Sequence, residues 1–169
     1  MQAFFQGLTM DFFEVLEKRH SIRKFSEKKI SPEIIEKLLG TVNSAPSAGN
    51  LKSYSIMIIK DAEKKQAIAK ASFGQGFIAS APIVLVFFAD ISVSSQKYGE
   101  RGKSLYAVQD ATIAAAYIQL AATALGISGC WIGAFDEREI SSICSVPSGL
   151  RPVAVFPLGF ASGPEADKA

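Results

Sequence analysis

Two arginines and a serine near the start of the chain have the chemistry and spacing of a phosphate-binding segment. Arg19, Ser21 and Arg23 occupy alternate positions, with His20 between the first two. Each guanidinium offers paired N–H donors to phosphate oxygens, and a hydroxyl adds a third donor. The same residues also fit a solvated basic face at a helix end, where cations offset the carbonyl dipole. The segment predicts a phosphate monoester site, with a plain basic surface as the alternative.

Two later segments stand out beside the arginine segment. One runs from Ser44 to Asn50 as Ser-Ala-Pro-Ser-Ala-Gly-Asn, and the other runs from Gly129 to Phe135 as Gly-Cys-Trp-Ile-Gly-Ala-Phe. Together with the arginine segment, and in this order, they resemble the nitroreductase family of FMN-dependent oxidoreductases. The resemblance extends over roughly residues 10 to 162.

The resemblance implies a role for each segment. In the family, the opening segment holds the FMN phosphate and ribityl chain, and the proline-serine segment comes from the partner subunit and lies along the flavin. The last segment is the ring-edge loop, in which a backbone N–H, here that of Ile132 or Gly133, faces flavin N5. The FMN-binding residues implied are Arg19, His20, Ser21, Arg23, Pro46, Ser47, Ala48, Asn50, Trp131, Ile132 and Gly133.

The chain departs from larger family members at two places. Where they have Gln-Pro-Trp after the asparagine, this chain has Lys52-Ser53-Tyr54. Where they carry a basic C-terminal cluster that reaches the phosphate, this chain has only Lys168. We therefore expect phosphate binding to depend on the N-terminal arginines.

The composition predicts one domain with a substantial core. The chain has 169 residues, 49% of them hydrophobic, which is enough for one ordinary domain and too few for two. We expect that domain to cover residues 10–169, after a short extension over residues 1–9. The formal net charge of +2, with no basic stripe beyond residues 18–29, argues against a nucleic-acid partner.

Metal, disulfide and membrane roles find little support in the sequence. One histidine with Cys130 and Cys144, outside any CxxC pair, gives too few soft ligands for zinc, and we expect both thiols to be buried and reduced. The apolar stretch 111–125 is rich in alanine and broken by Gln119, which indicates a buried helix rather than a membrane span. The start lacks a secretory pattern, so we expect a cytoplasmic protein.

Capping residues and apolar spacing predict the helices. A helix over 11–18 would place Phe12, Val15 and Leu16 on one face, with the charges on the other, and deliver Arg19 at its end. Ser31 and Pro32 have the pattern of a helix start. We expect further helices over 62–72, capped by Asp61, over about 105–125, ended by Gly126, and briefly after Asp136, which with Glu139 resembles a capping box.

The remaining segments predict strands and one lid. We expect strands over 54–60, 83–89, 128–133 and 152–160, with 83–89 central because it is apolar on both faces. The polar segment 90–104, which contains two glycines, is the candidate for a mobile lid.

The order of these elements predicts an α+β domain with a mixed, largely antiparallel sheet covered by helices. The resemblance implies the same architecture, with the long alanine-rich helix at the two-fold axis of a homodimer and FMN at the subunit interface. Alanines that would face this axis are Ala114, Ala115, Ala121 and Ala122.

Other motifs fit their contexts poorly. The segment 74–79 has the loose G-x-G-x-x-A form, but it follows a helix and precedes a strand, the reverse of a dinucleotide loop. His20 beside Ser21 suggests a hydrolase, but no G-x-S-x-G elbow exists. Trp131 is interpreted as a core residue with only its backbone near the ring. Candidates for a substrate pocket are Phe73, Tyr98 and Tyr106.

The resemblance implies an enzyme in which FMN carries the redox chemistry. NADH or NADPH would reduce FMN and leave, and a nitroaromatic, quinone or flavin-type acceptor would then take the same open face in a ping-pong mechanism. No catalytic side chain is required. The alternative is a flavin-binding carrier or sensor that does not turn over NAD(P)H.

Overall fold

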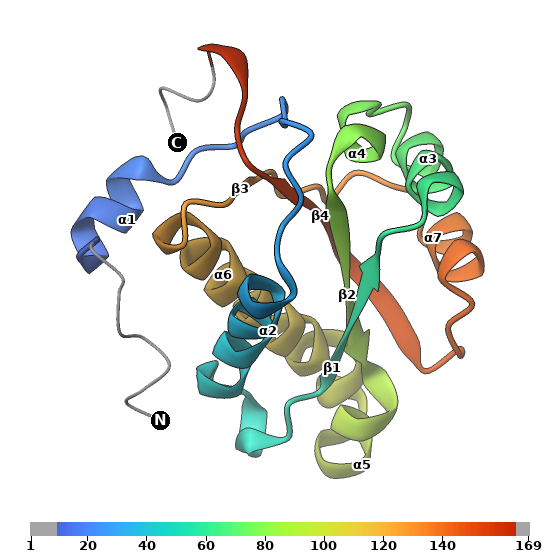
Figure 1. The fold of residues 1–169 in the computed structure, drawn as a ribbon. Helices are drawn as coiled ribbons and strands as arrows, with labels where there is room; N and C mark the ends of the chain where they lie inside the picture. The colour runs from blue at the N-terminus through green and yellow to red at the C-terminus, as the bar shows by residue number, and fades with distance from the viewer. Residues whose placement is uncertain (1–9, 165–169) are drawn as a thin grey trace.

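Four antiparallel strands form a sheet at the centre of the computed structural model, which describes residues 10–164 (Figure 1). The order across the sheet is β1, β2, β4, β3. The strands are β1 (Tyr54–Ile59), β2 (Ile83–Asp90), β3 (Ser128–Gly129) and β4 (Leu150–Gly159). An isolated parallel bridge joins Ser21 to Gly129, which gives the sheet its mixed character. The predicted α+β fold is therefore confirmed; residues 1–9 and Lys168 lie outside the described residues.

Helices cover both faces of the sheet. The helices are α1 (Phe12–Lys18), α2 (Pro32–Thr41), α3 (Ala62–Ala71), α4 (Phe77–Ser80), α5 (Ile91–Arg101), α6 (Ala107–Ala124) and α7 (Glu137–Cys144). Short helical turns are η2 (Val42–Ser44), η3 (Ala48–Asn50) and the π-helical η4 (Gly102–Tyr106). In Figure 1, α2 and α6 lie on one side of the sheet, and α3, α4 and α7 lie on the other.

Strand β2 is buried on both faces, as its sequence predicts. Leu85 and Phe87 pack into the core formed with α2 and α6, whereas Val84 and Val86 pack into the core formed with α3, α4 and α7. Side chains alternate across a strand, so one strand supplies both cores. Its pairing with β1 on one side and β4 on the other confirms that it is central.

The predicted helix boundaries are confirmed where a local cap defines them. The Ser31 hydroxyl accepts a hydrogen bond from the N–H of Ile34 at 3.4 Å. The Asp61 carboxylate accepts one from the N–H of Lys64 at 2.8 Å. Gly126, just beyond α6, has a φ of 70°, the left-handed conformation that favours glycine after a helix. Asp136 caps α7 by accepting from the N–H of Glu139 at 2.9 Å.

Residues 90–104, the candidate lid, form helices rather than an irregular connection. This segment forms α5 and most of η4, which continue into α6. Asp90 caps α5 by accepting a hydrogen bond from the N–H of Val93 at 3.0 Å, and Ser94 is fully buried. Gly99, with a φ of 56°, bends the helix within its length. The polar composition reflects a solvated outer face of a packed helix, because only one face needs apolar residues.

The alanines of α6 face the chain's own core. Ala114 and Ala115 have no exposed surface, and Ala122 has 1%. All three pack with α2 and the sheet in the same core as Leu85, so the prediction that they face a two-fold axis is wrong. Small side chains let α6 approach the sheet closely within one chain. Of the four predicted alanines, Ala121 is half-buried and packs against the same core.

The predicted apolar face of α1 is only partly buried within one chain. Val15 is buried, but Phe12 and Leu16 expose 60% and 44% of their surface, and the neighbouring Phe13 exposes 73%. The helix meets the rest of the chain mainly along α6. Its remaining apolar face forms a surface patch of a kind that often marks an interaction site.

Both cysteines are buried, as expected. Within residues 10–164, neither Cys130 nor Cys144 forms a disulfide. Burial raises the pKa of the Cys144 thiol, so its protonated form is favoured at neutral pH. In this part of the chain, no helix has both the length and the apolar character needed to cross a membrane.

Candidate functional site

The predicted phosphate segment is an extended stretch that leaves α1. Arg19 caps the helix, with its N–H donating to the Val15 carbonyl at 3.0 Å, and then the backbone becomes extended. Ile22 is 2% exposed and points into the molecule, whereas Ser21 and Arg23 on either side of it are exposed. Alternate residues of an extended chain share one side. The fold therefore presents the polar residues of this segment outward together.

Local contacts orient the side chains of this segment. The Arg23 guanidinium lies 5.7 Å from the centre of the Phe77 ring on α4, and its Nη1 donates to the Ser21 carbonyl at 3.4 Å. The His20 Nδ1 lies 3.1 Å from the Lys18 carbonyl oxygen. Stacking on an aromatic ring restricts an arginine without removing all of its donors. Arg23 is thus partly pre-positioned for an anion beside the N-terminus of α4.

A backbone contact joins the phosphate segment to the predicted ring-edge segment. Ser21 and Gly129 form a parallel bridge, and the Ile22 N–H donates to the Gly129 carbonyl at 3.0 Å. Gly129 itself pairs with Leu158 of β4. Segments more than a hundred residues apart in sequence are thereby held side by side at the edge of the sheet (Figure 1).

Gly129 is a glycine because β4 leaves no room for a side chain. A Cβ placed there would lie 2.7 Å from the Pro157 carbonyl oxygen and 2.8 Å from Leu158 Cδ2. We expect Gly129→Ala to lower the free energy of unfolding by about 1–3 kcal/mol, the usual cost of overpacking a core. Urea unfolding measures this change.

Gly76→Ala is the matched control for this substitution. A Cβ at Gly76 would meet no atom within 4 Å, and its φ is not in the left-handed region. The control is expected to change the free energy of unfolding by less than about 0.5 kcal/mol. Equal effects of the two substitutions would contradict this prediction, because they would show that β4 shifts to make room for the added methyl group at Gly129.

Only one of the two predicted backbone donors at the ring edge is available. The Ile132 N–H donates to the Val155 carbonyl at 2.9 Å, and the Ile132 side chain is 3% exposed. Ile132 is therefore a core residue, and its assignment as the N5 donor is wrong. Gly133 is exposed, and its N–H has no acceptor among residues 10–164. Trp131 is half-buried and packs against the main core, as interpreted.

The predicted loop from Pro46 to Asn50 lies away from the other two segments. It packs against the beginning of α6, while Gly129 follows the end of that helix (Figure 1). From Asp110 to Ala124 the helix covers about 20 Å at roughly 1.5 Å per residue. Within one chain, the structure therefore brings the first and third predicted segments together and leaves the second apart.

Asp110 anchors this loop, and sequence reasoning missed it. Its carboxylate is 2% exposed, and Oδ1 accepts a hydrogen bond from the N–H of Ala48 at 2.9 Å. Burial, and then the negative charge of Asp110, raise the pKa of the nearby Tyr54 hydroxyl, which stays protonated and donates to the Val42 carbonyl at 2.9 Å. The sequence feature that could have identified Asp110 is a single carboxylate near the start of an otherwise apolar helix.

Aromatic and cationic side chains surround the loop. Tyr98 and Tyr106 meet edge to face with 5.1 Å between ring centres, and Arg101 Nε donates to the Tyr106 hydroxyl at 2.9 Å. Tyr98 and Lys97 both lie against Gly49 of the loop, and Tyr106 lines a cavity beside it. Phe73, the third predicted candidate, lies after α3 and exposes 73% of its surface. The two tyrosines therefore lie beside the loop, whereas Phe73 lies on a different part of the surface.

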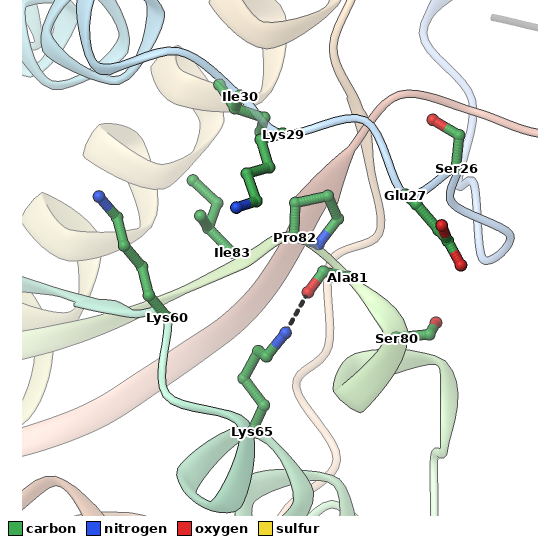
Figure 2. A pocket seen from close by; sticks show the side chains of 10 residues that line it. All are labelled: Ser26, Glu27, Lys29, Ile30, Lys60, Lys65, Ser80, Ala81, Pro82 and Ile83. Atoms are coloured by element: carbon green, nitrogen blue, oxygen red, sulfur yellow. Dashed lines mark hydrogen bonds between the residues drawn. The ribbon is translucent and has the colours of Figure 1, made fainter.

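A basic cavity of about 460 Å³ opens near the phosphate segment without including any of its predicted residues (Figure 2). Lys29, Lys60 and Lys65 surround it, and Lys65 Nζ donates to the Ala81 carbonyl at 2.7 Å. Glu27 supplies the acidic side chain of the lining. Lys29 is far in the sequence from Lys60 and Lys65, so no local pattern predicted that the three would meet.

Comparison with known proteins identifies the family. A model described as "Nitroreductase family" matches residues 16–78 and 73–160, which include most of the described chain. This chain belongs to the nitroreductase family.

Relatives and solved structures agree with this assignment. A nitroreductase family relative from Archaeoglobus fulgidus, whose name joins NADH dehydrogenase and NAD(P)H nitroreductase, is 32% identical over 87% of this chain and 83% of its own length. The crystal structure of a nitroreductase family protein from Clostridium novyi superposes with a TM-score of 0.83 at 30% identity, covering 95% of this chain and 89% of that one. An FMN-dependent nitroreductase from Clostridium difficile superposes with a TM-score of 0.77 at 28% identity, over 88% and 87% of the two chains.

The nitroreductase assignment supports oxidoreductase chemistry linked to NAD(P)H. The names of several relatives refer to NADH or NADPH. Within the described part of this nitroreductase chain, no three histidine, cysteine or acidic residues gather as metal ligands.

Proposed function

We propose that this nitroreductase is an FMN-dependent enzyme that uses NADH or NADPH to reduce nitroaromatic, quinone or flavin-type acceptors by a ping-pong mechanism. The observation that carries the proposal is the pairing of Ser21 with Gly129, which holds the phosphate segment beside the ring-edge segment. The similarity to an FMN-dependent nitroreductase at 28% identity supports the choice of flavin.

The residues at this edge of the sheet fit FMN. Arg19, Ser21 and Arg23 provide donors for a phosphate on one side of the extended segment. Gly133 provides an exposed backbone N–H with no acceptor among the described residues, which suits a ring nitrogen that gains electron density on reduction. The buried backbone around Ile132 and Val155 keeps this donor fixed relative to the sheet.

FMN, when bound, supplies the hydride and electron chemistry. The chain's own residues bind the phosphate, orient the ring and donate a hydrogen bond at its edge. None of them has to transfer a proton for this role, which agrees with the expectation that no catalytic acid or base is present. One open face serves both NAD(P)H and the acceptor in turn, which is the basis of the proposed ping-pong mechanism.

We propose that the active form is a homodimer with FMN between the subunits. The loop from Pro46 to Asn50 lies at the opposite end of α6 from Arg19 and Gly133, so a second copy is the direct way to bring it to the same flavin. The exposed apolar face of α1, with Phe12, Phe13 and Leu16, offers surface for such a contact.

A spectroscopic titration tests the cofactor and its reduction. The purified protein is mixed with FMN, freed of excess and examined by visible absorption, and then NADH or NADPH is added without oxygen. We expect retained flavin absorption that is lost on addition of the nicotinamide and restored by a quinone or nitroaromatic. Retained absorption that does not change would instead indicate a carrier or sensor, and loss of the flavin during removal of excess would contradict the site.

A further inference from the structure

We propose that Asp110 is a positioning residue that holds the loop from Pro46 to Asn50 in the conformation needed to contact FMN. The inference rests on the proposed flavin site, to which it adds a residue on a different element. Asp110 is not in any of the three segments that resemble the family's flavin contacts.

The contact is a buried hydrogen bond between residues far apart in the sequence. Asp110 exposes 2% of its surface, and its Oδ1 accepts from the Ala48 N–H at 2.9 Å across 62 positions. Hydrogen bonds to a charged acceptor are roughly twice as strong as neutral ones, and burial strengthens them further. This bond therefore fixes the first residue of η3 relative to α6.

The loop has a backbone that needs such support. Gly49, Asn50 and Lys52 have φ values of 58°, 57° and 51°, in the left-handed region, which glycine and asparagine tolerate but which is unfavourable for lysine. A second bond, from the Lys52 N–H to the Ser47 hydroxyl at 2.9 Å, closes the loop on itself. Among the hydrogen bonds within residues 10–164, the Asp110 bond is the one that ties the loop to a long helix of the core.

The other carboxylate oxygen argues that Asp110 does not serve stability alone. Oδ2 is buried and has no hydrogen-bond partner within the described residues. Leaving a buried oxygen without a donor has a desolvation cost of the same order as the contribution of the Oδ1 bond to folding. Such a group is retained where function requires it, as at other locally unfavourable positions in proteins.

Asp110 also lies beside a cavity next to the loop. It lines a cavity of about 450 Å³ together with Pro46, Ser47, Ala48 and Tyr106. A ligand binds more tightly to a loop that already has the bound conformation, because the loop loses less conformational entropy on binding. By accepting the hydrogen bond from the Ala48 N–H, Asp110 keeps the loop in one conformation relative to α6 and so increases the affinity for FMN.

Hydrogen exchange and FMN titration on the full chain test the proposal. In Asp110→Ala we expect the Ala48 amide to exchange at least about tenfold faster, because its acceptor is gone. The Kd for FMN should rise by about tenfold, the scale of one lost bond to a charged acceptor. Asp110→Asn keeps a carbonyl oxygen for the Ala48 N–H, so both quantities should stay within about threefold of wild type.

Ile118→Val is the matched control. Ile118 is a fully buried residue of the same helix, away from the loop, so its truncation loosens the core without removing the loop anchor. Its Ala48 exchange and FMN Kd should match wild type at temperatures well below unfolding. Unchanged exchange and Kd in folded Asp110→Ala would overturn the proposal, as would an Asp110→Asn variant as weak as Asp110→Ala.

The exchange readout separates this proposal from the flavin assignment. If wild type does not bind FMN, the proposed function fails while the exchange of Ala48 still reports on the anchor. If wild type binds FMN and Asp110→Ala exchanges faster without losing affinity, the flavin site stands and the positioning role is overturned.

Discussion

FMN binding is expected to weaken by about 30-fold or more when Arg19 and Arg23 are both replaced by alanine. Each arginine should contribute about 1–3 kcal/mol through charge-assisted hydrogen bonds to the phosphate. The two lie on the same side of an extended segment, beside the exposed Ser21, and Ile22 between them anchors that segment in the core. Fluorescence titration of FMN against the double variant measures the loss.

Two controls make this result specific. Arg138→Ala removes an exposed arginine from α7, distant in sequence from the phosphate segment, and should leave FMN binding unchanged. Arg19→Lys with Arg23→Lys keeps the charge and loses the paired donors, so its affinity should lie between wild type and the alanine variant. Full retention of FMN by a folded Arg19→Ala, Arg23→Ala protein would remove the phosphate assignment.

The features that sequence predicted correctly are those decided by neighbouring residues. The Ser31 hydroxyl and the Asp61 carboxylate each accept a backbone hydrogen bond at the start of a helix, and Gly126 ends a helix. Each of these effects involves residues only a few positions apart. The sequence of β2 is apolar on both faces, which is typical of a strand covered on both sides. It therefore predicted the central position of β2 in the sheet.

The features that sequence missed depend on partners far along the chain. An apolar face looks the same whether it packs inside the chain or against another molecule, so Ala114 was assigned to a dimer axis although it lies in the chain's own core. The Ile132 N–H was assigned to the flavin because its pairing with Val155 cannot be read from either segment alone. Asp110 was overlooked for the same reason, since its partner is 62 positions away.

The arrangement of the three segments leads to a test of where the loop acts. The segment of Arg19 and Arg23 meets the ring-edge segment within one chain, while the loop containing Gly49 sits at the other end of α6. If each flavin uses the loop of the other subunit, defects in the segment and in the loop should complement each other when placed on different chains of one dimer.

Gly49→Val provides the defect in the loop. Its φ of 58° suits glycine and is strained for a branched residue, and a Cβ there would run into the Tyr98 hydroxyl and the Lys97 side chain. Gly49 is exposed, so the strain falls on the loop rather than on the core. Homodimers of Gly49→Val, like those of Arg19→Ala with Arg23→Ala, are expected to retain little FMN.

The mixed dimer, purified through two different tags, is expected to bind one FMN per two chains with wild-type affinity. One of its sites combines the intact arginines of one chain with the intact loop of the other, and the second site carries both defects. Were the loop to act within its own chain, every site would carry one defect and no tight flavin would be found. Counting flavin per mixed dimer by absorption decides between the two arrangements, and a protein that stays monomeric at the concentrations used would contradict the shared site.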